Sequence, residues 1–248
     1  MTPELWLLII GAVVAGFVQG LSGFAFSMVA MSFWVWGIEP PVAAVMAVFG
    51  SLTGQLVAAF SVRRSLDFRA LAPFLAGGAI GIPLGILVLP YLNPHLFKLV
   101  LGLLLVVWCP FMLFSKNLPK VTGGGRFADG VVGAAGGFMG GLGGFSGAMP
   151  TLWCTLRGME KEQQRAIVQN FNLAALAVTM AGYVATGAIT RDMLPLLPIV
   201  AIALLVPVLL GARVYVGLSE AAFRKLVLSL LSLSGLAMLV SAVPRLLG

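Results

Sequence analysis

Eight apolar segments, separated by short stretches that hold most of the charged residues, constrain this chain more than any other feature. Each segment has at least the ~20 residues, most of them apolar, that a helix needs to cross a hydrocarbon core about 30 Å thick. Charged residues make up only 9% of the chain, whereas a soluble domain has about 25%. We therefore predict an all-α, polytopic membrane protein with apolar segments at residues 5–36, 42–62, 70–90, 96–115, 129–153, 166–187, 193–213 and 224–243.

Two of these segments, 5–36 and 129–153, are rich in glycine and resemble each other. A shift of 121 residues places Gly20-Leu21 on Gly141-Leu142 and Gly23-Phe24 on Gly144-Phe145. The same register continues to Glu39 and Glu160. We infer that the chain consists of two four-segment halves, residues 1–115 and 128–248. A linker at 116–127, with the turn and charge content of an exposed connection, joins them.

The placement of the 15 cations distinguishes two topologies. If all eight segments cross the membrane, the two sides receive eight and seven cations, although Lys and Arg of short loops normally concentrate in the cytoplasm. If each glycine-rich segment is a re-entrant hairpin, which enters and leaves on one side, only Lys98, Arg191 and Arg245 lie opposite the other twelve. Those twelve are Arg63, Arg64, Arg69, Lys116, Lys120, Arg126, Arg157, Lys161, Arg165, Arg213, Arg224 and Lys225.

We therefore expect two inverted repeats, each a glycine-rich re-entrant helical hairpin followed by three transmembrane helices. Inverted repeats recur among secondary transporters. The linker 116–127 is then cytoplasmic, in a multi-pass protein of the bacterial inner membrane. A plain topology of eight spans remains the alternative.

The turns of the two hairpins are the candidate substrate site. A helix break leaves backbone N–H and C=O groups that protein or a watery cavity must satisfy, and a helix N-terminus can hold an anion without a charged side chain. Ser51 falls on Asn172 under the same shift, which strengthens that pair. The candidate residues are Gln19, Gly20, Ser22, Gly23, Ser51, Gln55, Gly143, Gly144, Ser146, Asn170 and Asn172, and Thr53 and Gln169 are further polar residues of these segments. The alternative is that the glycines only allow close helix packing.

The acidic residues indicate the sign of the substrate. All eight lie at or near segment ends, whereas proton relays and cation pathways usually place carboxylates within the membrane. This distribution favours an anion. Cys and His residues lack metal-ligand spacing, and no nucleotide-binding loop or nucleophile motif occurs. We therefore expect no metal, no cofactor, no enzymatic activity and no binding of nucleic acid.

The second glycine motif, from Gly140 to Pro150, resembles that of the TauE/SafE sulfite exporter-like family of membrane transporters. The resemblance covers essentially the whole chain, with its two repeated halves. In the first motif, Ser22 and Phe24 stand where more glycine is usual, and Val29 replaces the proline. Family membership implies transport, often export, of sulfite, sulfoacetate or other organosulfonates.

Together these observations predict a secondary transporter that exports small sulfur-containing anions by alternating access. A membrane-bound enzyme or assembly factor, or a metal-ion transporter, is the alternative. The expected partners are the anion and membrane lipids, and a homodimer is left open.

Overall fold

The protein is built from α-helices, as the apolar segments predict. The computed structural model describes residues 3–23, 25–61, 67–114, 120–214 and 220–247, and no strand occurs among them. The first half contains α1 (Pro3–Ser22), α2 (Phe26–Trp34), α3 (Pro40–Ser61), α4 (Phe68–Val88) and α5 (Pro94–Leu113). The second half contains α6 (Gly125–Gly143), α7 (Ala148–Leu156), α8 (Lys161–Ala185), α9 (Leu196–Val214) and α10 (Glu220–Leu247). Two short 3₁₀ turns, Leu89–Tyr91 and Arg191–Met193, precede α5 and α9.

Seven of the described helices are long and apolar enough to cross a membrane: α1, α3, α4, α5, α8, α9 and α10. The chain is therefore a multi-pass membrane protein. Helix α6 is long enough, but its glycines, Arg126 and Asp129 lower its hydropathy. The remaining segment, 129–153, is thus two helices, α6 and α7, and neither is among the candidate spans. The linker is shorter than predicted, because α6 already begins at Gly125, and its residues 116–119 lie outside the described part.

Each glycine-rich segment folds back on itself at a glycine. Gly23, between α1 and α2, has φ 84°, and Gly144, between α6 and α7, has φ 82°. At the far end of the first hairpin, the indole N–H of Trp34 donates to the carbonyl of Leu8 at 3.2 Å. The outer ends of α1 and α2 therefore lie together.

The second hairpin is closed in the same way, but by charged groups. The indole N–H of Trp153 donates to Asp129 at 2.7 Å. Arg157 forms an ion pair with the same carboxylate at 3.2 Å. In both hairpins a tryptophan of the short helix is bonded near the start of the long helix.

Glycines allow helices of different halves to pack backbone against backbone. A Cβ placed on Gly81 of α4 would lie 2.0 Å from the carbonyl oxygen of Ala134 in α6. A Cβ on Gly20 of α1 would lie 2.2 Å from the carbonyl oxygen of Val208 in α9. Small residues at such interfaces let helices approach closely where no hydrophobic effect drives them together. The long helix of each hairpin thus packs against the other half.

The neighbours of the glycines also give the helix directions. Gly77 and Gly81 of α4 meet Gly130 and Ala134 of α6 in turn, so these two helices run in the same direction. Helices α1 and α9 also run in the same direction, since Gly16 and Gly20 meet Leu204 and Val208.

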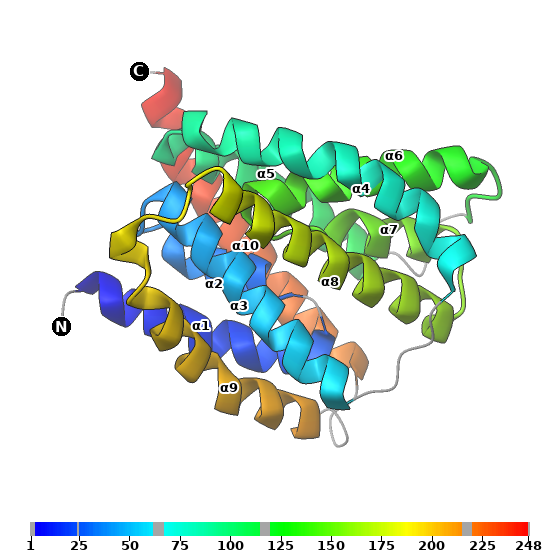
Figure 1. Ribbon diagram of the computed structural model, residues 1–248, viewed down its shortest axis with the longest axis horizontal. Helices are drawn as coiled ribbons and strands as arrows, with labels where there is room; N and C mark the ends of the chain where they lie inside the picture. Colours follow the sequence, from blue (N-terminus) through cyan, green and yellow to red (C-terminus); the bar gives the residue numbers. More distant parts are fainter. Residues whose placement is uncertain (1–2, 24, 62–66, 115–119, 215–219, 248) are drawn as a thin grey trace.

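Helices α5 and α10 run in opposite directions, because Gly102 lies beside Leu239 and Val106 beside Gly235. In Figure 1, α1 begins and α10 ends on the left of the bundle, whereas α4, α6 and α8 begin on the right.

Most cations with described side chains lie at the end of the bundle where α4, α6 and α8 begin. These are Arg69, Lys120, Arg126, Arg157, Arg165, Arg213 and Lys225. Lys98 and Arg191 lie at the other end, at the starts of α5 and of the 3₁₀ turn before α9. Arg63, Arg64 and Lys116 lie outside the described residues, and the side chains of Lys161, Arg224 and Arg245 are likewise outside them.

The backbone contact of α4 with α6 gives a test of the fold. We expect Gly81→Ala to destabilise the protein by about 1–3 kcal/mol, because the methyl group would force the two helices apart. Gly130→Ala is the matched control, since a Cβ there would lie 3.6 Å from its nearest neighbour, an ordinary contact. Thermal unfolding in detergent micelles measures both variants, and equal melting temperatures would contradict this packing.

Candidate functional site

The two helix breaks have the same local geometry. At the first, the N–H of Gly23 donates to the carbonyl of Gln19 at 2.7 Å, and at the second, the N–H of Gly144 donates to Gly140 at 2.8 Å. Both glycines are in the left-handed region, where a side chain is strained. The sequence folds back here because glycine ends the long helix and the short helix starts three or four residues later.

Each break faces the other half of the chain. A Cβ on Gly23 would lie 2.8 Å from Nε2 of Gln169 in α8. A Cβ on Gly144 would lie 2.4 Å from Oγ of Ser27 in α2 and 3.3 Å from Val48 in α3. The 121-residue shift carries Gly23 to Gly144 and Val48 to Gln169. Equivalent positions therefore meet across the molecule, beside α3 and α8, which pack against each other.

A cluster of buried polar side chains lies beside the first break. The hydroxyls of Ser27 and Ser51 are 2.6 Å apart, and the hydroxyl of Ser27 also donates to the carbonyl of Ala47 at 3.3 Å. The amide of Gln19 donates to the carbonyl of Ser51 at 3.0 Å. The amide of Gln55 donates to the carbonyl of Gly23, within the break itself. All four polar side chains are at most 2% exposed.

The second break has a smaller polar cluster. The hydroxyl of Ser146 donates to the side-chain carbonyl of Asn172, and both residues are buried. The hydroxyl of Tyr183 donates to the carbonyl of Gly141 at 2.7 Å, in the last turn of α6. Ser51 in α3 and Asn172 in α8, which are equivalent under the shift, thus each bond a serine that follows the break of their own half.

The structure brings seven of the predicted site residues to the two breaks: Gln19, Gly23, Ser51, Gln55, Gly144, Ser146 and Asn172. The structure shows other contacts for the remaining four. Gly20 packs against α9, and Gly143, just before the second break, packs against Phe145 and Met31. Ser22 is exposed; its hydroxyl donates to Val18 in its own helix and accepts the N–H of Ala25 across the first break. Asn170 lines a cavity of about 280 Å³ with Asp67, Glu160 and Glu162, near the cationic end of the bundle.

Two residues beside the breaks are absent from the predicted set. Ser27 bridges Ser51 and approaches Gly144. Gln169 faces Gly23, whereas Asn170, its neighbour in sequence, lines the cavity with Asp67, Glu160 and Glu162. The sequence feature that could have identified Ser27 is a serine within an apolar run, four residues after Gly23. To choose Gln169 over Asn170 one must know which face of α8 points toward the break, and the sequence alone does not give this orientation.

The electrostatics of the site come from backbone and neutral side chains. Asp129 is the one charged residue among the buried polar residues described, and it lies at the end of the bundle, paired with Arg157. The short helices α2 and α7 start at the breaks, so the positive ends of their dipoles point there. The site can therefore bind a small ion through N–H groups, hydroxyls and amides. In the described part of the chain, no group of His, Cys, Asp and Glu could hold a metal ion.

The family model described as sulfite exporter TauE/SafE matches residues 8–238, which include both hairpins and the long helices after them. No curated protein and no solved structure matches the chain. Members of this family are membrane transporters, which confirms the prediction that the protein is not an enzyme. Since the match covers nearly all of the 248 residues, the chain belongs to the TauE/SafE sulfite exporter family.

Proposed function

We propose that the protein is a secondary transporter of the bacterial inner membrane, which exports sulfite or small organosulfonates such as sulfoacetate. The observation that carries this proposal is the meeting of two equivalent helix breaks beside α3 and α8, lined by buried uncharged polar side chains. Transporters built from repeats bind their substrates at such breaks, near the bilayer midplane. The substrate anion takes over hydrogen bonds that these groups otherwise make with one another and with the backbone.

In this proposal the two halves are inverted repeats. Helices α5 and α10 are the last helices of their halves, and they run in opposite directions. An axis in the membrane plane relates repeats whose equivalent helices are antiparallel, whereas an axis along the membrane normal relates parallel ones. Helices α1 and α6 are equivalent in the two halves, as are α9 and α4. The axis therefore exchanges the pair α1 and α9 with the pair α6 and α4, and each of these pairs runs in one direction, as such an exchange requires.

The glycine-rich segments are re-entrant hairpins in this proposal. The bonds between Trp34 and Leu8, and between Trp153 and Asp129, hold the two outer ends of each hairpin on one side. The end of the bundle that carries most of the described cations then faces the cytoplasm, in agreement with the bias of short loops. The linker 116–127 lies on that side.

The anion would lie between the starts of α2 and α7. Their first-turn N–H groups and dipoles favour negative charge. The hydroxyls of Ser27, Ser51 and Ser146 and the amides of Gln55 and Asn172 can rotate to donate hydrogen bonds to sulfonate or sulfite oxygens. No carboxylate of the described buried residues lies beside the breaks to repel the anion.

The packing suggests how access alternates. Helix α1 carries the first hairpin and packs on α9, while α6 carries the second and packs on α4. Each hairpin therefore moves with a helix of the opposite half. Rocking of these two groups about the contact of α3 with α8 would open the site first to one side and then to the other.

Anion binding can be tested at Ser51. We expect Ser51→Ala to weaken binding of sulfite or sulfoacetate about 10-fold, because a buried hydrogen bond to a charged ligand is lost. Asn172→Ala should have an effect of similar size. Ser32→Ala is the matched control, since its hydroxyl donates to the carbonyl of Val29 in its own helix. Isothermal titration of the purified protein measures all three. Binding of inorganic cations without a response to anions would instead favour the metal-ion transporter.

Inversion of the halves can be tested with Ile38→Cys and Met159→Cys, which are equivalent, half-exposed positions just after α2 and α7. In a background without Cys109 and Cys154, a membrane-impermeant thiol reagent applied to intact cells should label position 38. Position 159 should react only after the cells are opened. Labelling of both positions from one side would refute the inverted topology.

A further inference from the structure

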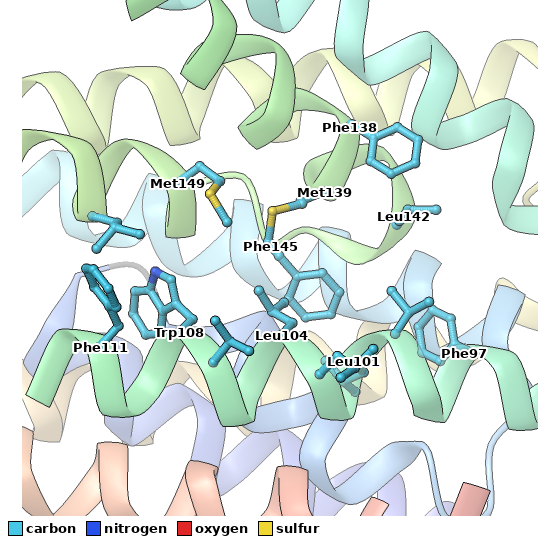
Figure 2. A pocket seen from close by; sticks show the side chains of 14 residues that line it. Phe97, Leu101, Leu104, Trp108, Phe111, Phe138, Met139, Leu142, Phe145 and Met149 are labelled. Carbon is cyan, nitrogen blue, oxygen red and sulfur yellow. The ribbon is translucent and has the colours of Figure 1, made fainter. Parts of the chain in front are cut away.

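An apolar groove runs between α5 and the second hairpin. It has a volume of about 510 Å³, within the ~300–1,000 Å³ of small-molecule sites. Figure 2 shows Phe145 and Met149, from the break and from α7, on the side opposite Leu104 and Trp108 of α5. All fourteen lining residues are hydrophobic. The groove opens along the exposed side chains of α5, which are Val100, Leu103, Val107 and Phe111.

The groove is long enough to hold a lipid acyl chain. Its lining on α5 extends from Phe97 to Phe111, which corresponds to about 21 Å at 1.5 Å per helical residue. One leaflet of the hydrocarbon core is about 15 Å thick. Helix α5 is itself a candidate membrane span, so the groove lies at the depth of the acyl chains.

The two halves differ at this place. In the first hairpin, α2 packs against α10. In the second hairpin, α7 is joined to α5 by a hydrogen bond from the indole N–H of Trp108 to the carbonyl of Ala148, at 2.9 Å, and the groove lies beside this bond. The groove thus lies between α5 of the first half and the hairpin of the second half.

Cations lie beyond the α7 end of the groove. Leu152 lines the groove and α7 ends at Leu156, whose carbonyl accepts the N–H of Val121 at 2.9 Å. This bond holds the neighbouring Lys120 at the end of α7, and Arg126 lies in the first turn of α6. Both cations are exposed. Neither forms an ion pair within the described residues, where Arg157 is already paired with Asp129.

We propose that the groove binds an anionic phospholipid of the cytoplasmic leaflet. One acyl chain lies between α5 and the second hairpin, and the headgroup phosphate contacts Lys120 and Arg126. Basic residues at the cytoplasmic surface attract anionic headgroups, while the uncharged lining accepts only an apolar chain. The assignment to that leaflet rests on the orientation proposed above. The bound chain fills the space beside the break at Gly144 and sets the separation of α5 from α7.

Native mass spectrometry of the delipidated, full-length protein tests the headgroup. Phosphatidylglycerol and phosphatidylcholine with identical chains are added together, and we expect the protein to retain the anionic lipid preferentially. Lys120→Gln and Arg126→Gln should each reduce this preference about fivefold. Arg191→Gln, at the other end of the bundle, is the matched control and should leave it unchanged. Equal retention of both lipids by the unmodified protein, or an equal effect of the control, would overturn the proposal.

The position of the lipid acyl chain is tested by filling the groove with a larger side chain. Leu104→Trp should abolish lipid retention, whereas Leu230→Trp, on an exposed face of α10, should not. The unmodified protein gives a second measurement, because brominated phosphatidylglycerol should quench Trp108 more than brominated phosphatidylcholine does. This difference should vanish in Trp108→Phe. The proposal would be overturned if Leu104→Trp retained as much lipid as the control or if the quenching difference were absent. Disulfide cross-linking of two copies through Val107→Cys would also overturn it. None of these measurements involves the transported anion, so they stand apart from the test of transport.

Discussion

Backbone polar groups at the two helix breaks must find partners inside the protein, and this requirement organises the centre of the molecule. Away from bulk water each unpaired group is costly. The amide of Gln55 therefore bonds the carbonyl of Gly23, and the hydroxyl of Tyr183 bonds that of Gly141. Among the buried polar side chains of α3 and α8, those of Ser51, Gln55, Gln169 and Asn172 lie where the breaks approach these helices. The side chains that hydrogen-bond the backbone groups at the breaks can also exchange such a bond for one to a substrate.

The sequence predicted the features that depend on local pattern. The lengths of the apolar segments predicted helices of which seven are candidate membrane spans, and both breaks, at Gly23 and Gly144, fall within the duplicated glycine motifs. Packing across the halves was not predictable, because it depends on which face each helix presents. Gly20 illustrates this: its place in the motif suggested a site residue, but it lies on the face of α1 that contacts α9. Asn170 and Gln169 differ for the same reason, since neighbouring residues of a helix point about 100° apart.

The two halves use one plan with different chemistry. The first hairpin is closed by a neutral bond from Trp34 to a backbone carbonyl, and the second by Trp153 and Arg157 on a carboxylate. The first hairpin packs against α10, whereas the groove lies between the second and α5. The charged closure belongs to the hairpin whose glycine motif is closer to the family pattern, and the groove borders the same hairpin. Sequence divergence between the repeats thus coincides with the structural differences between the hairpins.

The contact of α1 with α9 has a consequence for biosynthesis. Gly20 and Gly211 lie against each other but are 191 residues apart in the chain. Helix α1 therefore leaves the ribosome long before α9 has been synthesised. Until then, the small-residue face of α1 contacts lipids or the insertion machinery. Helix α4 waits only until α6 is made. The second hairpin can thus contact α4 early in translation, whereas α1 cannot reach its final place until α9 has been made.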